Sequence, residues 1–148
     1  MEQPSTDRVV WALRRAFQAV EGAKERRLRD LGVAGAHYGI LINLAASPGI
    51  TGAELARRLH VTPQNVASLM GKLVDRGWVQ RRGHPLHAHV LEVHLTDEGR
   101  RVLKAADTEV AALEVALRSH LGASESRAFR DLLEATAAFH EAAAERRG

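Results

Sequence analysis

Apolar side chains recur every three or four positions along most of this chain, which is the period of an amphipathic α-helix. The pattern predicts six helices, over residues 7–31, 34–47, 52–59, 62–77, 96–121 and 124–148. Ser5, Thr6 or Asp7 can cap the first helix, and Gly32 follows its end. The fourth helix starts with Thr62 before a proline, and Ser124 can cap the last. The second helix is expected to bury its central apolar residues, Leu41, Ile42 and Leu44.

The period becomes twofold in one region, as it does in strands with one buried face. The segments WVQRR (78–82) and HVLEVHL (89–95) predict two strands, which the loop GHPLH (83–87) joins into a hairpin. The chain order is therefore four helices, a hairpin and two helices. This order predicts a mainly α fold with a small β-hairpin.

The segment ELARRLHVTPQNVASLMGKLVDRG (54–77) places two short helices on either side of a tight turn. Apolar residues recur on both sides of the turn: Leu55, Ala56, Leu59 and Val61 before it, and Val66, Leu69, Met70, Leu73 and Val74 after it. This spacing lets the two helices bury one shared seam, as helix-turn-helix units do.

The opposite face of the second of these helices carries two amides, one hydroxyl and a single charged side chain. Its residues are Gln64, Asn65, Ser68 and Lys72. Gln and Asn can pair bidentately with adenine in the major groove, Ser takes donor or acceptor partners, and Lys reaches guanine or phosphate. The helix N-terminus adds free N–H groups that attract phosphate. The face therefore favours recognition of DNA bases. The alternative interpretation is that it is the solvent-exposed side of an ordinary helical hairpin.

Charge is distributed unevenly along the chain, whose formal net charge is +3. Residues 51–104 carry nine Lys and Arg against five Asp and Glu, whereas residues 105–148 carry five against eight. The middle of the chain is therefore the expected partner of a polyanion.

Several functional classes are disfavoured by what the sequence lacks. There is no cysteine, which removes disulfides, thiolate metal sites and thiol redox sensing. No P-loop, dinucleotide fingerprint, Gly-x-Ser-x-Gly or His-Glu-x-x-His motif occurs, so we expect neither an enzyme nor a cofactor. No secretion signal or membrane-length apolar run is present, and the expected location is the cytoplasm.

A hairpin directly after a helix-turn-helix, with Arg81 and Arg82 at its base, is a winged-helix arrangement. The run LARRLHVTPQNVASLMGKLVDRGWVQRR (55–82), the wing segment 83–94 and LTDEGRRVL (95–103) together resemble the MarR family of bacterial transcription regulators. The most specific part is the pattern apolar–Thr–Asp/Glu–Glu–Gly, here Leu95 to Gly99. The resemblance extends over about residues 34–103, and the flanking helices match it in number and placement.

This resemblance implies a homodimer, usually a repressor, whose two winged lobes bind a pseudopalindromic DNA duplex. It assigns dimerisation to residues 1–33 and 104–148 and DNA binding to the lobe 34–103. Apolar stripes at Val10, Leu13 and Phe17 and at Leu117, Leu121, Phe129, Leu132, Leu133 and Phe139 agree with it, because they flank a lobe that has its own core. Packing of these stripes on each other within one subunit is the alternative.

The remaining site predictions follow from the same resemblance. The residues expected near phosphates are Thr62, Arg57, Arg58, Arg76, Arg81 and Arg82, with His87 and His89 at the wing. Small aromatic or phenolic carboxylates often bind the cleft between dimer helices and lobe in this family and weaken its DNA binding. The residues that could line this cleft are Trp11, Arg14, Arg15, His37 and Tyr38. In the alternative interpretation, Trp11 belongs to the dimer core and the arginines lie on the solvated surface.

The wing departs from the family's pattern, in which an Asp-x-Arg near the tip inserts its Arg into the minor groove. His87, Ala88 and His89 occupy those positions, which puts that contact in doubt. If His87 and His89 lay on one strand face, they and His84 could bind a metal ion, so a metal-responsive regulator is one alternative. A winged-helix interaction module with weakened DNA binding is another.

Overall fold

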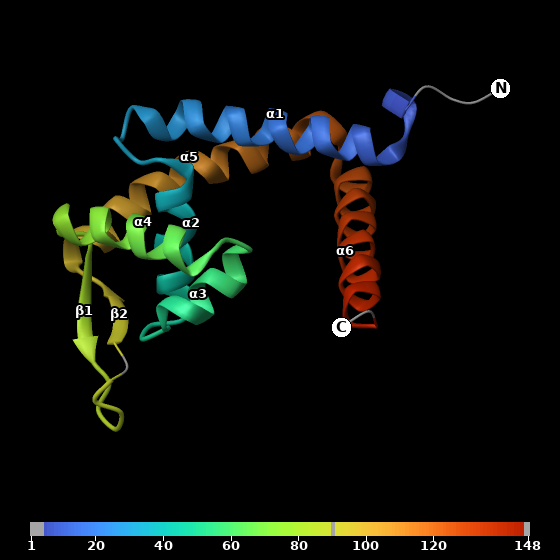
Figure 1. The fold of residues 1–148 in the computed structure, drawn as a ribbon. Coiled ribbons are helices and arrows are strands. Elements are labelled where there is room, and N and C mark those ends of the chain that lie inside the picture. The colour runs from blue at the N-terminus through green and yellow to red at the C-terminus, as the bar shows by residue number, and fades with distance from the viewer. Residues whose placement is uncertain (1–4, 90, 147–148) are drawn as a thin grey trace. The chain divides into compact units, whose positions relative to one another are not determined.

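The computed structural model of the protein describes residues 5–89 and 91–146 (Figure 1). Its elements are a short 3-10 turn η1 (Ser5–Asp7), α1 (Val9–Arg29), α2 (Gly35–Ala46), α3 (Gly52–Leu59), α4 (Pro63–Asp75), β1 (Val79–Gly83), β2 (Leu91–Leu95), α5 (Asp97–Leu121) and α6 (Ala123–Glu145). The predicted order of four helices, a hairpin and two helices is confirmed. The described residues divide into two compact units, one up to Val110 and one from Ala111 onward.

The core of the larger unit is the seam that the helix-turn-helix pattern predicted. Its buried residues are Ile40, Leu41, Leu44, Ile50, Leu55, Ala56, Val66, Met70, Leu73, Val79, Val93, Leu95 and Leu103. The prediction for Ile42 was wrong, because its side chain is 36% exposed. The middle of α2 is apolar all round, so the sequence period does not distinguish Ile42 from its buried neighbours.

The turn between α3 and α4 is built from His60 and Thr62. His60 ends α3 with a φ of 52°, a left-handed conformation that glycine adopts more readily. The Thr62 hydroxyl accepts a hydrogen bond from the Asn65 amide at 3.2 Å, and Pro63 takes the first helical position. Thr62 therefore caps α4 as predicted.

The hairpin continues into the lobe through a third extended segment. β1 and β2 pair antiparallel from Val79–Leu95 to Gly83–Leu91. Thr51 bridges to Glu92, and the backbones of Gly49 and Ile50 exchange hydrogen bonds with that of Val93. The wing is thereby attached to the lobe along β2 as well as through the end of α4.

Two of the predicted helix caps were wrong. Residues 5–7 form the turn η1, and α1 begins after Arg8 without a side-chain cap. Gly122, with a φ of 93°, turns the chain directly into α6 at Ala123. Ser124 therefore lies inside the first turn of α6, where it cannot act as the N-cap.

The helices outside the lobe leave large apolar side chains exposed. On α1 these include Val10 and Phe17, which is 64% exposed. In the unit from Ala111 onward, Leu132 and Phe139 on α6 are 66% and 65% exposed, and no described residue of α6 is buried. Among the described helices, none is long and apolar enough to cross a membrane.

Candidate nucleic-acid interface

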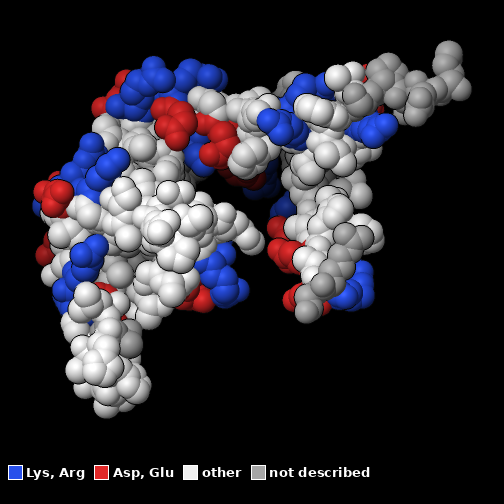
Figure 2. Space-filling view, in the orientation of Figure 1, with Lys and Arg blue, Asp and Glu red and all other residues white. Residues whose placement is uncertain are grey.

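The outer face of α4 carries all four residues predicted to read bases. Gln64, Asn65, Ser68 and Lys72 are exposed, while Val66, Met70 and Leu73 on the opposite face are buried. In Figure 2 the surface around α3 and α4 is largely uncharged, and Lys and Arg gather at its margins. A side chain added at Gly71, on this helix, would meet no atom within 4 Å. The face is therefore open to a large partner such as a DNA groove.

Arg57 and Arg58 are already paired within the lobe. Glu54 accepts hydrogen bonds from the Nε and Nη2 atoms of Arg57, at 2.8 and 2.7 Å, and from Nε of Arg58 at 3.0 Å. Arg58 also donates to the Ser47 hydroxyl at 2.7 Å. Hydrogen bonds from these two guanidinium groups lower the pKa of Glu54 to about 2, so its carboxylate keeps its charge at neutral pH. Any phosphate must therefore share these arginines with Glu54.

We predict that Glu54→Gln raises affinity for any DNA duplex, by roughly two- to tenfold at low salt, because it frees two cations at the protein surface. The Thr51 cap uses the backbone amide of residue 54 and should survive the substitution. Fluorescence anisotropy on an unrelated duplex measures the change. Glu98→Gln is the matched control, since it removes a carboxylate that pairs with Arg101 on α5. An equal gain in both variants would contradict a specific role for Glu54.

Arg76, which follows α4, already makes contacts within the chain. Its guanidinium donates to the carbonyl of Gly32, between α1 and α2, and lies over the Trp78 ring at 4.6 Å from the centroid. Thr62 uses its hydroxyl oxygen as the cap of α4, which leaves the hydroxyl hydrogen to donate. The phosphate roles of both residues stay predictions.

The wing presents its cations on two faces. Arg81 and Arg82 are exposed neighbours in β1, so their side chains leave opposite faces of the hairpin. His87 and His89 are exposed and lie in the connection between the strands, because strand pairing ends at Gly83 and Leu91. The strand geometry assumed for a metal site at these two residues was wrong.

A different set of imidazoles gathers at the wing. His94 lies 2.9 Å and His84 lies 3.6 Å from the two carboxylate oxygens of Glu92, and His84 stacks on His87 at 4.9 Å. Over residues 5–89 and 91–146, no group of three His, Cys, Asp or Glu could hold a metal ion. The Glu92–His94 pair was not predicted from the sequence, although the i, i+2 spacing in a strand indicates a shared face.

The five residues predicted for a ligand cleft fall into two groups. Arg14 lies over the Trp11 ring at 5.7 Å in the first half of α1, and Arg15 is exposed beside it. His37 and Tyr38 lie in the first turn of α2, near Glu25. The Glu25 carboxylate accepts a hydrogen bond from the Gly35 amide at 2.8 Å. Trp11 and Glu25 are fourteen residues apart on one helix, which corresponds to about 21 Å. A single subunit therefore does not assemble this cleft.

Tyr38 borders on a groove that the sequence did not predict. Tyr38 donates a hydrogen bond to Asp107 at 2.8 Å; its burial, and then this bond, raise its pKa to about 12. The groove has a volume of about 620 Å³ and is lined by Ile42, Leu44, Ala45, Pro48, Arg82, His94, Leu95, Arg100, Leu103, Lys104 and Asp107. An available signal was the i, i+4, i+7 spacing of Tyr38, Ile42 and Ala45 on α2.

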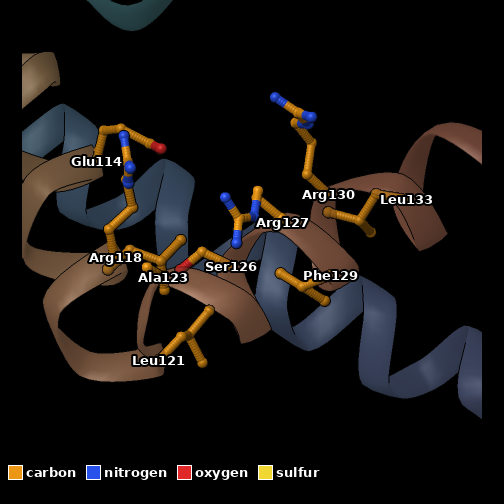
Figure 3. Close-up of a pocket in the computed structure, with 10 residues that line it drawn as sticks. Glu114, Arg118, Leu121, Ala123, Ser126, Arg127, Phe129, Arg130 and Leu133 are labelled. Carbon is orange, nitrogen blue, oxygen red and sulfur yellow. The ribbon is translucent and has the colours of Figure 1, made fainter.

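A second hollow lies in the unit from Ala111 onward (Figure 3). It has a volume of about 360 Å³ and is lined by Glu114, Leu117, Arg118, Leu121, Ala123, Ser126, Arg127, Phe129, Arg130 and Leu133. Apolar side chains from the end of α5 and the start of α6 therefore line this hollow together with three arginines. They belong to the stripe for which a partner was predicted.

A helix-turn-helix whose second helix is followed by a hairpin defines a winged-helix DNA-binding lobe. The MarR family model matches residues 31–88. The HTH-type transcriptional repressor Rv2887 of Mycobacterium tuberculosis is 36% identical over 107 residues, which cover 72% of this chain and 77% of the relative. The chain therefore belongs to the MarR family.

Solved structures agree with this assignment. The repressor CouR bound to a 23-mer DNA duplex has a TM-score of 0.83 and 26% identity, covering 92% of this chain and 99% of that chain. The complex of the Mycobacterium tuberculosis MarR family protein Rv2887 with salicylic acid has a TM-score of 0.72 and 30% identity, covering 89% and 98%. Both likenesses cover about nine-tenths of this chain, and they therefore extend beyond residues 34–103 into the flanking helices.

Proposed function

We propose that this protein is a homodimeric repressor that binds a pseudopalindromic DNA operator and is released by a small organic ligand. The observation that carries the proposal is the outer face of α4, where Gln64, Asn65, Ser68 and Lys72 stand exposed on a helix anchored by a buried seam. Amides and hydroxyls on a rigid helix suit the edges of bases in a major groove. The DNA-bound CouR supports the same use of the fold.

Dimerisation is proposed for residues 1–33 and 104–148, and DNA binding for residues 34–103. Phe17 on α1 and Leu132 and Phe139 on α6 are each more than half exposed, although burying one such side chain is worth about 1.5–3 kcal/mol. A second copy of the chain can bury these residues, and large apolar surfaces of this kind mark obligate interfaces.

The ligand is proposed to be a small aromatic carboxylate, a class to which the salicylic acid bound by Rv2887 belongs. In a homodimer, Trp11, Arg14 and Arg15 of one subunit can approach Tyr38 of the other, whereas His37, which is 8% exposed, is buried away from such a cleft. The groove beside Tyr38 adds an apolar floor at Ile42 and Ala45 and a cation at Lys104. Its volume lies within the range of about 300–1,000 Å³ found for small-molecule sites.

The test is fluorescence anisotropy of the purified protein on duplexes tiled across the DNA upstream of its own gene, from about 50 to about 200 mM salt. We expect one tile to bind tightly, with the logarithm of affinity falling by about 0.9 per phosphate contact for each unit of log salt. Arg81→Gln should flatten that slope by about 0.9 per subunit. Weak binding to every tile, with a shallow slope, would favour an interaction module over a repressor.

A further inference from the structure

Three side chains from different parts of the lobe meet at the end of the proposed DNA-reading helix. Arg76, directly after α4, lies over the Trp78 ring and donates to the Gly32 carbonyl between α1 and α2. His37 on α2 meets the same Trp78 ring edge-on, with the ring centroids 6.4 Å apart and the planes at 86°. Arg76 and Trp78 together therefore connect the end of α4 to both the α1–α2 turn and α2.

His37 is the buried member of this group. Its side chain is 8% exposed, and its Nδ1 atom has no hydrogen-bond partner among the described residues. A neutral imidazole tolerates one nitrogen without a donor, whereas an imidazolium must place a second N–H there. No acceptor for that N–H lies within reach in the part of the chain that the structure describes.

The charges that face His37 also oppose its protonation. Arg76, directly after α4, and Lys72 on α4 disfavour its protonation, and Glu25 on α1 acts in the opposite direction. Burial, followed by these two cations, lowers the pKa of His37 below its usual value of 6.5. A charged His37 would add a third cation beside two residues that belong to the proposed DNA-binding surface.

We propose that His37 is a positioning residue for the DNA-reading helix. In its neutral form it packs against Trp78 and holds the end of α4 on the α1–α2 turn. Protonation places a cation against Arg76 and Lys72 in a site without an acceptor and displaces that end of α4. The inference rests on the proposed function and adds a regulation of the same surface, in which acidification weakens DNA binding.

The first test compares operator affinity by anisotropy at about pH 7.5 and about pH 5.5, at constant ionic strength. The background is His87→Ala/His89→Ala, which removes the exposed wing histidines. We expect affinity in this background to fall by roughly three- to tenfold on acidification, and the added His37→Phe substitution to abolish that fall. Phe keeps an aromatic edge for Trp78 but cannot be protonated. Added His120→Phe is the matched control and should leave the fall intact.

A second readout needs no DNA. Because the pKa of His37 in the fold is below 6.5, the unfolded chain takes up the proton first as the pH falls. The stabilising effect of this residue is therefore complete above pH 6.5 and is lost as the pH falls from there through the lowered pKa. Chemical denaturation at a series of pH values should show this loss in the wild type and a smaller one in His37→Phe. His37→Asn, which is polar and does not titrate, serves if His37→Phe folds poorly.

The outcomes separate the two proposals. Failure of the wild type to bind any duplex at about pH 7.5 would overturn the proposed function. A second outcome is that the protein binds its operator tightly while acidification lowers the affinity of the His87→Ala/His89→Ala background equally with and without His37→Phe. That result would overturn the inference and leave the proposed function intact. The inference would also be overturned if the added His120→Phe substitution abolished the fall in affinity as His37→Phe does, because the effect would then not be specific to His37.

Discussion

Replacing Gly99 by alanine is expected to destabilise the fold by about 3 kcal/mol or more, a large part of the roughly 5–15 kcal/mol that holds a domain folded. A Cβ atom at this position would lie 1.9 Å from the carbonyl oxygen of Trp78 and 2.9 Å from its carbonyl carbon. Both are backbone atoms, so no side-chain rotation can relieve the overlap. The first turn of α5 would have to move away from the start of β1.

Thr96 shows why that approach cannot easily open. Its backbone amide donates to the same Trp78 carbonyl at 3.1 Å, and its hydroxyl donates to the Gly77 carbonyl at 2.6 Å. The Gly99 amide donates to the Thr96 hydroxyl oxygen at 3.0 Å, which caps α5. The Thr-x-x-Gly part of the sequence pattern is therefore a junction between α4, the hairpin and α5.

Chemical denaturation followed by circular dichroism measures the effect, and Gly71→Ala provides the control. Gly71 also lies inside a helix, but an added Cβ there meets nothing, so this variant should gain up to about 1 kcal/mol from helix propensity. An unfolding free energy for Gly99→Ala equal to that of the wild type would show that the close approach does not determine the pattern.

The local part of the fold could be predicted from the sequence because its signals are local. The apolar period across residues 54–77 fixed the helix-turn-helix, and Thr62 before Pro63 fixed the start of α4 within one residue. The spacing also assigned the exposed face of α4 correctly, since residues 64, 65, 68 and 72 are opposite the buried seam. The roles of these residues on DNA stay predictions.

Contacts between distant segments could not be predicted in the same way. The sequence analysis assigned Arg76 to a phosphate contact, because nothing in the sequence pairs it with Gly32, 44 positions away. His37 was assigned to a ligand cleft, whereas the structure buries it beside Trp78. The pairing of Glu54 with Arg57 and Arg58 was available from its i, i+3 and i, i+4 spacing and was overlooked. Position along a helix predicts exposure better than it predicts partners.

Asn65→Ala is expected to weaken operator binding by about 1–3 kcal/mol, or roughly 5- to 150-fold, while affinity for unrelated DNA changes little. The bond from residue 65 to the Thr62 hydroxyl comes from the backbone amide, so alanine preserves the cap of α4. Alanine also favours the helix more than asparagine does. The substitution therefore removes a pair of base-reading groups from the exposed face without disturbing the helix that presents them.

Competition anisotropy with operators changed one base pair at a time distinguishes reading from general attraction. If Asn65 pairs with adenine, the wild type should discriminate at one position in each half-site, and the variant should lose that discrimination while keeping the salt slope. Arg81→Gln should behave in the opposite way, lowering affinity for every duplex and flattening the slope by about 0.9 for each phosphate that the protein no longer neutralises. An Asn65→Ala variant that loses affinity equally on all duplexes would place the residue on the DNA backbone, and base reading would then fall to Gln64 and Ser68.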